Sequence, residues 1–354
     1  MSVTMRTIDA HTHVFPQYAD MAVRVMDLCG IEQTITLEWH DGFGPTLEKH
    51  LEIFAAHPGR FVVFGNVDWS RIDEKDFGAT AAAQLERDVA LGTRGLKVYK
   101  ALGLEYRRAS GELWKIAAPE LDPIWSQAGE SGIPVLIHAA DPAAFWQPVD
   151  AENFWNGVLY GEYAWWSYCG KNVPGRRELI ADRNRMIARH PETTFICPHM
   201  GSNSDDLETA ADDLDRLPNI YYDISARIPA LGFSKERAAR SRQFLTKYQD
   251  RILFGTDSIY DDINVPTGMQ AQCLYQPGEN LPGEKVAKEK YIETTARFFR
   301  SHIDFLTTDE IQTDPPFNRN LEGFSIAGLA LSADVCEKIL YRNISRLIPG
   351  EVPN

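Results

Sequence analysis

Two histidines one residue apart, His11 and His13, stand in the segment IDAHTHVFP near the start of the chain. If this segment is a strand, its side chains alternate between two faces, so both imidazoles point to one side with Cα atoms roughly 6.6 Å apart. Two imidazoles so placed can bind one metal ion. An isolated H-x-H pair can equally be one packed and one solvated histidine. Other segments of the chain are needed to distinguish these two interpretations.

Eight short apolar segments alternate with helical segments along the chain. They are RTIDAHTH, GIEQTITL, RFVVFGNV, TRGLKVY, IPVLIHA, TTFICPHM, NIYYDIS and RILFGTD. Strands that alternate with helices form right-handed crossovers and a parallel sheet. Eight such units predict an α/β fold, a closed (β/α)8 TIM barrel, with a doubly wound open sheet as the structural alternative. We expect residues 1–354 to form a single domain.

Further residues that can bind metal lie where these segments end. Lys97 lies in the fourth segment, and His138, His199 and Asp257 end the fifth, sixth and eighth. The C-terminal ends of barrel strands meet at one mouth, where chemistry takes place. Packing explains this distribution poorly, because each buried imidazole or carboxylate would need its own partner. The pattern therefore favours a metal site at the mouth.

Four of these motifs also carry a family resemblance. DAHTH, VLIHA, CPHMG and FGTD resemble the signature of the amidohydrolase superfamily, and the closing IAGLALSADVCEKILYRNISRLI is similar to the tail of the subgroup that contains aminocarboxymuconate-semialdehyde decarboxylase. The resemblance implies that His11, His13, His138 and Asp257 hold the catalytic metal. It implies that His199 holds a second metal, or polarises the substrate or the attacking water.

Lys97, in GLKVYK, resembles a lysine of dinuclear members such as urease and the hydantoinases, where it is carboxylated and bridges two metals. The decarboxylase-like subgroup usually holds one metal. Carbamate formation needs the neutral amine, which burial and nearby cations favour. The alternative is an unmodified lysine paired with a carboxylate such as Asp257, and both interpretations stay open. Lys100 has the opposite strand parity and competes only if the strand is bulged.

The ligand types indicate the chemistry. Neutral imidazoles and a carboxylate suit one or two Zn²⁺ ions, with Mn²⁺ or Fe²⁺ as alternatives, and lower the pKa of a bound water to about 7. We predict a metal-dependent hydrolase that uses metal-bound hydroxide, with Asp257 as the proton shuttle. The alternative is a metal-dependent, non-oxidative carboxy-lyase in which His199 or Asp257 transfers the proton. A non-catalytic binding or assembly protein is disfavoured, because every expected ligand type is present.

Substrate contacts are predicted at two further positions. Tyr99 shares the strand face of Lys97, and Arg227 follows the seventh strand, where its guanidinium can clamp a substrate carboxylate. A solvated loop charge is an equal alternative for Arg227. We therefore expect a small substrate that bears a carboxylate. Asp9, two residues before His11 and on the same face, and Asp223 are expected to be interior hydrogen-bonding partners.

Three segments do not fit the regular alternation of short strands and helices. Residues 140–175, rich in Trp and Tyr, are too long for an ordinary loop and predict a lid after the fifth strand, although its tryptophans more simply pack against the barrel. A second long loop, 258–285, follows the last strand. Residues 332–348 have helical apolar spacing and predict a C-terminal packing helix.

Composition limits the partners. A net charge of −14 and a pI near 5.1 argue against nucleic acid or a membrane surface as the main partner and favour small molecules. A homo-oligomer is compatible with the sequence. Five cysteines without a C-x-x-C pair indicate reduced thiols. No leader segment or long apolar run is recognisable, so we expect a cytoplasmic protein.

Overall fold

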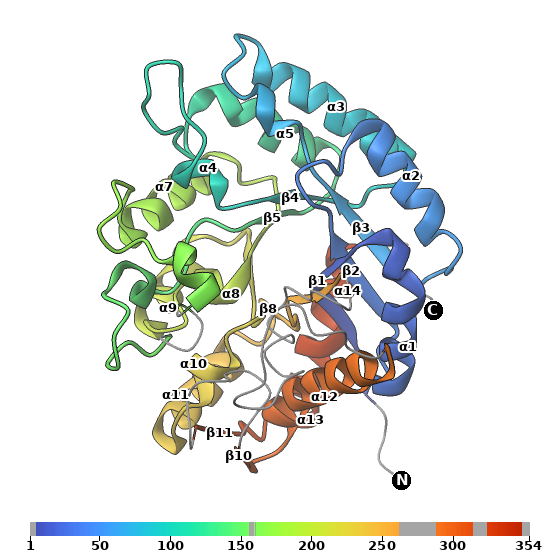
Figure 1. Ribbon diagram of the computed structural model, residues 1–354, viewed down its shortest axis with the longest axis vertical. Coiled ribbons are helices and arrows are strands. Elements are labelled where there is room, and N and C mark those ends of the chain that lie inside the picture. Colours follow the sequence, from blue (N-terminus) through green and yellow to red (C-terminus); the bar gives the residue numbers. More distant parts are fainter. Residues whose placement is uncertain (1–4, 156–158, 160, 262–287, 314–323, 349–354) are drawn as a thin grey trace.

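The computed structural model describes residues 5–155, 159, 161–261, 288–313 and 324–348. Its centre is a parallel sheet of nine strands in the order β8-β7-β6-β5-β4-β3-β2-β1-β9, curled into a barrel with helices around it (Figure 1). The strands are β1 (Ile8–Val14), β2 (Gln33–Leu37), β3 (Phe61–Gly65), β4 (Gly95–Val98), β5 (Val135–Ile137), β6 (Phe195–Cys197), β7 (Ile220–Asp223), β8 (Ile252–Leu253) and β9 (Ser258–Tyr260).

The last two strands are successive parts of the eighth barrel position, and together they close the barrel. β8 pairs with β7, whereas β9 pairs with β1 through Thr12 and Ser258. Between them, the Ala10 N–H donates to Phe254 O at 2.9 Å, and the Asp257 N–H donates to His11 O at 2.8 Å. Each of the eight predicted segments contains an observed strand, and the predicted TIM barrel is confirmed.

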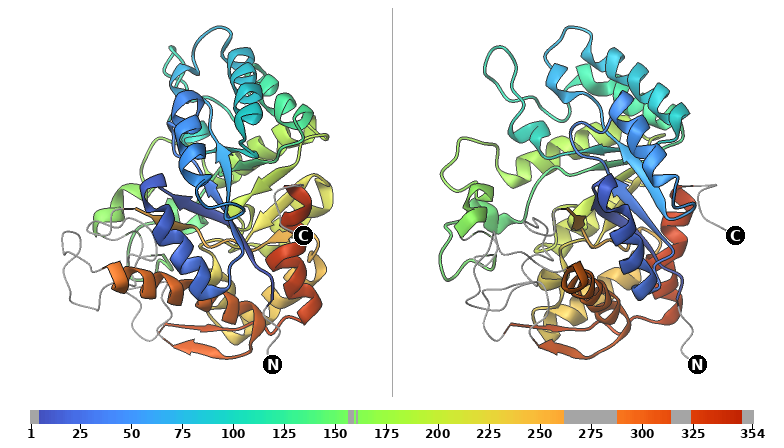
Figure 2. Two further views of the ribbon diagram at one scale, coloured as in Figure 1. Left: turned by 90° about the vertical axis from the view of Figure 1, so that its right-hand side faces the viewer. Right: turned by 45° about the vertical axis from the view of Figure 1, so that its right-hand side comes forward.

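The helices lie outside the strands, and Figure 2 shows α12 running beside α1. The α-helices are α1 (Ala19–Cys29), α2 (Gly44–Phe54), α3 (Phe77–Leu91), α4 (Ala101–Leu104), α5 (Asp122–Glu130), α7 (Arg176–Arg189), α8 (Pro198–Gly201), α9 (Leu207–Arg216), α10 (Ile228–Gly232), α11 (Lys235–Lys247), α12 (Lys288–Thr307), α13 (Ala333–Glu337) and α14 (Asn343–Leu347). The 3₁₀ turns are η1 (Pro16–Tyr18), η2 (Trp69–Arg71), η3 (Pro119–Leu121), η4 (Ala143–Trp146) and η5 (Gly161–Trp166). The π-helical turn η7 (Lys338–Arg342) joins α13 to α14. A small antiparallel pair, β10 (Ile311–Thr313) and β11 (Ser325–Ala327), lies beside the barrel.

Mainly aliphatic side chains of β1, β2, β3, β5, β6 and β8 form a buried cluster inside the barrel. This cluster also contains Ile344 and Ile348, so the C-terminal helical segment packs against the barrel interior. Its strand members are Ile8, Ala10, Ile35, Leu37, Val62, Phe64, Leu136, Ile196 and Leu253. A separate cluster that contains Leu96 and Val98 lies between the strands and the helices.

A β-bulge in β1 sets the direction of its histidines. Asp9 and Thr12, three residues apart, pair with residues of β2 that are only two apart. Paired residues of parallel strands point the same way, so Asp9 and Thr12 share one face, while His11 and His13 take the other. The prediction that Asp9 and His11 share a face is therefore wrong. The bulge lets Ala10 and His11 both face the interior.

The aromatic segment 140–175 packs on itself and on the barrel wall where it is described. Phe145, Trp155 and Leu159 are buried with Ala230 of α10, whereas Trp165 is 63% exposed. This packing agrees with the simpler interpretation of its tryptophans, and its function as a lid stays a prediction. The second long loop, 258–285, lies mostly outside the described residues, apart from β9 and the residue that follows it.

Within the described residues, no helix is both long and apolar enough to cross a membrane.

Candidate metal centre

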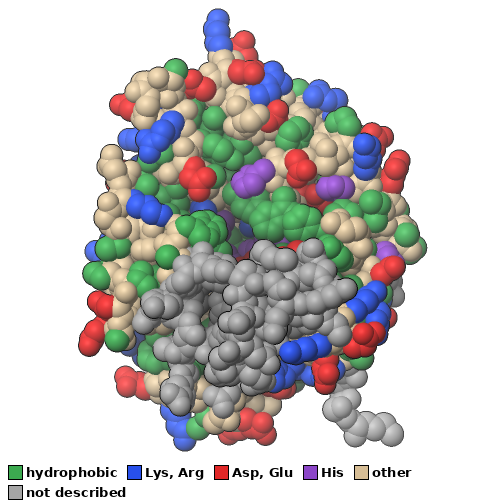
Figure 3. Space-filling view, viewed as in Figure 1, with side chains coloured by type: hydrophobic (Ala, Val, Ile, Leu, Met, Phe, Trp, Pro, Cys, Tyr) green, Lys and Arg blue, Asp and Glu red, His purple; other side chains and the backbone are tan. Residues whose placement is uncertain are grey.

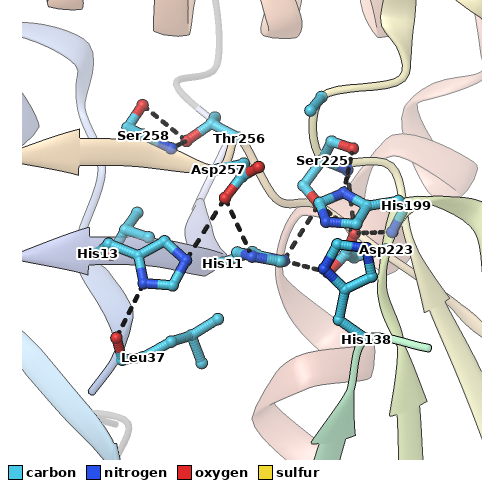
Figure 4. A network of polar contacts seen from close by, with 12 residues as sticks. His11, His13, Leu37, His138, His199, Asp223, Ser225, Thr256, Asp257 and Ser258 are labelled. Carbon is cyan, nitrogen blue, oxygen red and sulfur yellow. Dashed lines mark hydrogen bonds and ion pairs between the residues drawn. The ribbon is translucent and has the colours of Figure 1, made fainter. Parts of the chain in front are cut away.

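The two histidines of β1 converge on the carboxylate of Asp257, just before β9. Asp257 Oδ1 lies 3.2 Å from His11 Nε2 and 3.5 Å from His13 Nε2 (Figure 4). These three residues form a group in which single nitrogen and oxygen atoms are close enough to share one ion. Ligands at 2.0–2.1 Å from a tetrahedral Zn²⁺ are separated by about 3.4 Å, and the two measured separations fit that value.

Hydrogen bonds on the far side of each ring aim these nitrogens at Asp257. His11 Nδ1 donates to Asp223 Oδ2 at 2.8 Å, and His13 Nδ1 donates to Leu37 O at 2.9 Å. The network therefore assigns the protons to Nδ1 and leaves the Nε2 lone pairs facing a carboxylate oxygen. His11 Nε2 is buried without a hydrogen bond among the described residues. Three electron-pair donors that converge in this way need a cation between them.

The pKa values of the two histidines respond to this arrangement in different directions. Burial lowers the pKa of His13 to about 4, so its imidazole is neutral at physiological pH. Burial acts on His11 in the same direction, but the carboxylates of Asp223 and Asp257 outweigh it and raise its pKa. The two carboxylates beside His11 thus favour positive charge at this ring.

Asp223, at the end of β7, and Ser225 connect two histidines of the site. Asp223 accepts a hydrogen bond from His11. It also accepts one on Oδ1 from the backbone N–H of His199, at 2.8 Å. The Ser225 hydroxyl lies 3.1 Å from His11 Nδ1 and 2.9 Å from His199 Nδ1. Burial would raise the pKa of Asp223, but His11 and hydrogen bonds hold it well below its ordinary value. Asp223 is the interior partner that was expected from the sequence.

His199 is held in an uncommon backbone conformation. Its φ of 59° and those of Met200 (60°) and Ser202 (66°) lie in the left-handed region. Asp257 has a φ of 64°. Residues other than glycine persist in this region only where surrounding contacts fix them, and such residues cluster at functional sites. Here the fixing contacts include buried Arg183, whose guanidinium donates to Gly201 O at 2.9 Å.

The tautomer of His199 limits its chemistry. His199 Nδ1 donates to Ser225 O at 2.9 Å, so Nε2 carries a lone pair. Burial, with Arg227 and His138 nearby, places the pKa of His199 well below its ordinary value. A neutral imidazole of this kind can bind a cation or accept a proton. It cannot donate a hydrogen bond from Nε2 to a substrate carbonyl.

His138, after β5, lies against His199 with ring centroids 4.6 Å apart. Burial lowers the pKa of His138 to about 4, so its ring is neutral. His138 does not belong to the close groups that His11 forms with His13 and Asp257, or with His199 and Asp223. That statement covers the described residues. The predicted ligand set is therefore split between a tight group and a neighbouring group.

Lys97 points into the barrel, as strand parity predicts. Its Nζ lies 4.9 Å from the centroid of the Tyr99 ring, and its side chain is fully buried. Burial lowers the pKa of Lys97 to about 8, against the opposing effect of Asp257 and Asp223. Within the described residues, no carboxylate forms an ion pair with Lys97, so the predicted alternative of a paired ammonium has no support in these contacts. A lowered pKa increases the fraction of neutral amine.

The sequence belongs to a known family along almost its whole length. A family model described as Amidohydrolase matches residues 8–349. The chain belongs to this amidohydrolase family. No curated protein matches the chain.

Solved structures resemble this amidohydrolase over nearly all of both chains. Dihydroxybenzoic acid decarboxylase from Polaromonas sp. JS666, with bound manganese and the inhibitor 2-nitroresorcinol, is 18% identical with a TM-score of 0.52, covering 97% of each chain. 2,6-Dihydroxybenzoate decarboxylase from Rhizobium is 17% identical with a TM-score of 0.50, covering 97% of this chain and 98% of that one. At these identities the likeness shows the fold.

Arg227 is an interior residue of the amidohydrolase, so its interpretation as a solvated loop charge is wrong. The side chain precedes α10 and is 5% exposed. Its Cζ lies 5.4 Å from the centroid of Trp155, and Nη1 donates to Ala226 O at 2.8 Å. Nε is buried without a hydrogen bond among the described residues. The guanidinium thus has unused donor capacity for an anionic group.

Aromatic residues after β2 and β4 form a wall beside His13, and Trp39 is a member that was not predicted from the sequence. Trp39, after β2, stacks on His13 with centroids 4.6 Å apart and on Tyr99 at 5.7 Å. The Tyr99 hydroxyl donates to Glu38 O at 3.1 Å. Figure 3 shows histidine and hydrophobic side chains together near the middle of this face. The position of Trp39 two residues after a predicted strand was the available signal.

Two histidines near the ends of helices lie outside the centre. His190 follows α7, and its Nε2 lies 3.1 Å from Asp122 Oδ1. His57 follows α2, and its Nε2 lies 3.2 Å from Asp20. Neither belongs to the groups that could hold an ion.

Proposed function

We propose that this amidohydrolase is a metal-dependent hydrolase of a small, carboxylate-bearing compound. The observation that carries the proposal is the convergence of His11 Nε2, His13 Nε2 and Asp257 Oδ1, each without a proton of its own to share. Buried lone pairs in this arrangement repel one another unless a cation lies between them.

A divalent ion fits the residues present. His11, His13 and Asp257 would hold it, with His138 and His199 on the neighbouring side. Neutral imidazoles with one carboxylate suit Zn²⁺, and Mn²⁺ or Fe²⁺ are alternatives. Such an ion supplies Lewis-acid chemistry, because it polarises a substrate oxygen and makes water more acidic.

The proton transfers of hydrolysis are assigned to Asp257 and His199. The Asp257 carboxylate accepts a proton from the attacking water and returns it to the leaving group. Burial would raise the pKa of Asp257, but His11 and His13 hold it well below its ordinary value, so the ionised base is the resting form. The unprotonated Nε2 of His199 either completes the ion's ligands or accepts a hydrogen bond from the water.

Arg227 and the aromatic wall support a carboxylate-bearing substrate. Among the described residues, Nε of Arg227 has no hydrogen-bond acceptor, so it can donate to a substrate carboxylate. Trp39 and Tyr99 offer flat faces on which a planar substrate packs.

A carboxy-lyase is the second candidate. The manganese-bound structure with a similar fold is a decarboxylase, and the closing segment of this chain resembles the decarboxylase-like subgroup. In this reaction the carbon–carbon bond to the carboxylate breaks, CO₂ leaves with its former oxygens, and a proton is added to carbon. No water is consumed.

Reaction in H₂¹⁸O distinguishes the two. The probes are carboxylate-bearing lactones, esters and amides, and hydroxybenzoates, followed by mass spectrometry. Hydrolysis places one ¹⁸O in the product, whereas decarboxylation releases CO₂ and leaves the organic product unlabelled. Product from a lactone, ester or amide with ¹⁸O, abolished in Asp257→Asn, supports the hydrolase. CO₂ release from a hydroxybenzoate without ¹⁸O incorporation contradicts it and favours the lyase.

A further inference from the structure

Asp141 is the centre of a buried polar cluster next to the metal centre, and it has no role in the proposed reaction. Asp141 follows β5, three residues after His138, and is 4% exposed. Its Oδ2 accepts hydrogen bonds from the Lys100 ammonium at 2.5 Å and from the Tyr168 hydroxyl at 3.0 Å. Its Oδ1 lies 3.4 Å from His138 Nε2.

The three partners come from different parts of the chain. Lys100 stands just after β4, His138 just after β5, and Tyr168 near the end of the aromatic segment 140–175. The aromatic side of the cluster is closed by Trp146, whose ring centroid is 4.5 Å from that of Tyr168. The Lys100 ammonium also lies 5.7 Å from the Tyr168 ring centroid. One carboxylate therefore joins two strand ends to the aromatic segment.

His138 has an incomplete contact in this cluster. Its Nε2 is buried and makes no hydrogen bond within the described residues, although Asp141 Oδ1 is only 3.4 Å away. A small rotation of either side chain brings the two atoms into hydrogen-bonding geometry. Nε2 would then donate to Asp141, which fixes the proton there and leaves the Nδ1 lone pair for a cation. Carboxylates commonly orient metal-binding histidines in this way.

We propose that Asp141 is a positioning residue for His138, and that Lys100 and Tyr168 hold its carboxylate in place. Tyr168 thereby makes the orientation of His138 depend on the aromatic segment. This inference rests on the proposed function, because it takes His138 to face the bound ion. It adds a residue that touches neither substrate nor ion.

A second cluster of the same composition provides a matched control. Asp215 Oδ2 accepts the Tyr248 hydroxyl at 3.0 Å and lies 3.4 Å from Lys247 Nζ. This cluster joins α9 to α11 and is more exposed, with no histidine beside it among the described residues. Asp215→Asn and Tyr248→Phe therefore remove the same chemical groups away from the metal centre.

The test measures the affinity of the full chain for Zn²⁺ by competition with a chelator, together with NMR signals of the His138 imidazole nitrogens. Asp141→Asn should weaken Zn²⁺ binding roughly 10- to 100-fold, and Tyr168→Phe should weaken it less. Both should shift the His138 signals. Asp215→Asn and Tyr248→Phe should change neither.

Tyr168→Phe keeps the ring that packs on Trp146, so it tests the inference even if Asp141→Asn does not fold. Unchanged affinity and unchanged His138 signals in a folded Asp141→Asn or Tyr168→Phe overturn it. His138→Ala separates this failure from failure of the proposed function. If His138→Ala binds Zn²⁺ normally while His11→Ala does not, the role of Asp141 is overturned and the metal centre stands.

Discussion

The two sides of the metal centre are built differently. On the side of β1 and Asp257, far-side acceptors fix both histidines, so His11 Nε2 and His13 Nε2 face one carboxylate oxygen. On the side of β4 and β5, His138 Nε2 is buried without a hydrogen bond, and buried Lys97 forms no ion pair, among the described residues. Hydrogen bonds to other strands fix the side chains of the first side. The side chains of the second side need a cation, a modification or contacts with neighbouring loops to fix them.

Removing the carboxylate of the first side should have the largest effect on turnover. Asp257→Asn keeps the shape of the side chain but cannot accept a proton, so kcat should fall roughly 10²- to 10⁴-fold. Steady-state kinetics on whichever probe is turned over measures this loss. Asp215→Asn, far from the centre, is the control. A kcat within a factor of about three of the wild type would remove Asp257 as the base.

Variants of Lys97 test whether carboxylation of this lysine supplies a metal ligand on the side of β4 and β5. We predict that bicarbonate raises metal occupancy, that Lys97→Ala lowers it, and that short carboxylic acids partly restore it, because they replace the missing carbamate. Elemental analysis gives the occupancy, and ¹³C NMR with labelled bicarbonate detects the carbamate.

Short carboxylic acids should restore metal occupancy in Lys97→Ala but not in Lys100→Ala. In the wild type the Lys100 ammonium is paired with Asp141. A single, fully occupied ion with no carbamate signal would exclude the bridging role and favour the lyase.

Arg227 belongs to neither set of metal ligands and should affect substrate binding instead. Arg227→Met removes a charged hydrogen bond to the substrate carboxylate, which contributes about 1.5–3 kcal/mol, so KM should rise roughly 10- to 150-fold. Metal content should stay unchanged. Arg251→Met, at the other end of the barrel, should leave KM unaltered. Equal KM values for the Arg227 variant and the wild type would show that the substrate does not use this guanidinium.

His302 of α12 is a buried histidine outside the centre and should have the smallest effect on function. It packs on Phe298 with centroids 4.6 Å apart, and burial lowers its pKa to about 4. The unfolded chain, with a histidine pKa near 6.5, binds the proton first as the pH falls. The free energy of unfolding therefore decreases from about pH 6.5 to about pH 4, by at most ~3 kcal/mol.

His302→Gln should reduce this pH dependence and leave metal content intact. Unfolding of the wild type and the variant at several pH values provides the measurement. Identical pH dependence in both proteins would mean that His302 titrates normally in the fold.

The strands and most candidate ligands were predictable because they depend on local patterns. Short apolar segments that alternate with helical segments located the strands, and strand parity predicted that Lys97 points inward. The bulge in β1 was not predictable, because it arises from pairing with β2, and it reversed the expected face of Asp9. Asp9 instead accepts from the Thr256 hydroxyl at 2.6 Å.

Contacts between segments that are distant along the chain could not be predicted from the sequence either. His11 and Asp223 are far apart along the chain, and only the closed barrel brings them together. The Asp141 cluster depends on the path of the aromatic segment, which has no periodic pattern to read. Ser225 is the last residue of the predicted strand segment NIYYDIS, and Trp39 lies two residues after GIEQTITL, so a systematic search of strand ends would have included them.

The central claim is that His11 and His13 hold a divalent ion with Asp257. Its most direct test is the metal content per chain of the purified wild type and of the double variant His11→Ala/His13→Ala, after incubation with Zn²⁺ and removal of free metal. The control is His57→Ala/His190→Ala, which removes two histidines at helix ends. We predict at least one ion per chain in the wild type and control, and none in the His11/His13 variant. A folded double variant that keeps its full metal content would contradict the account.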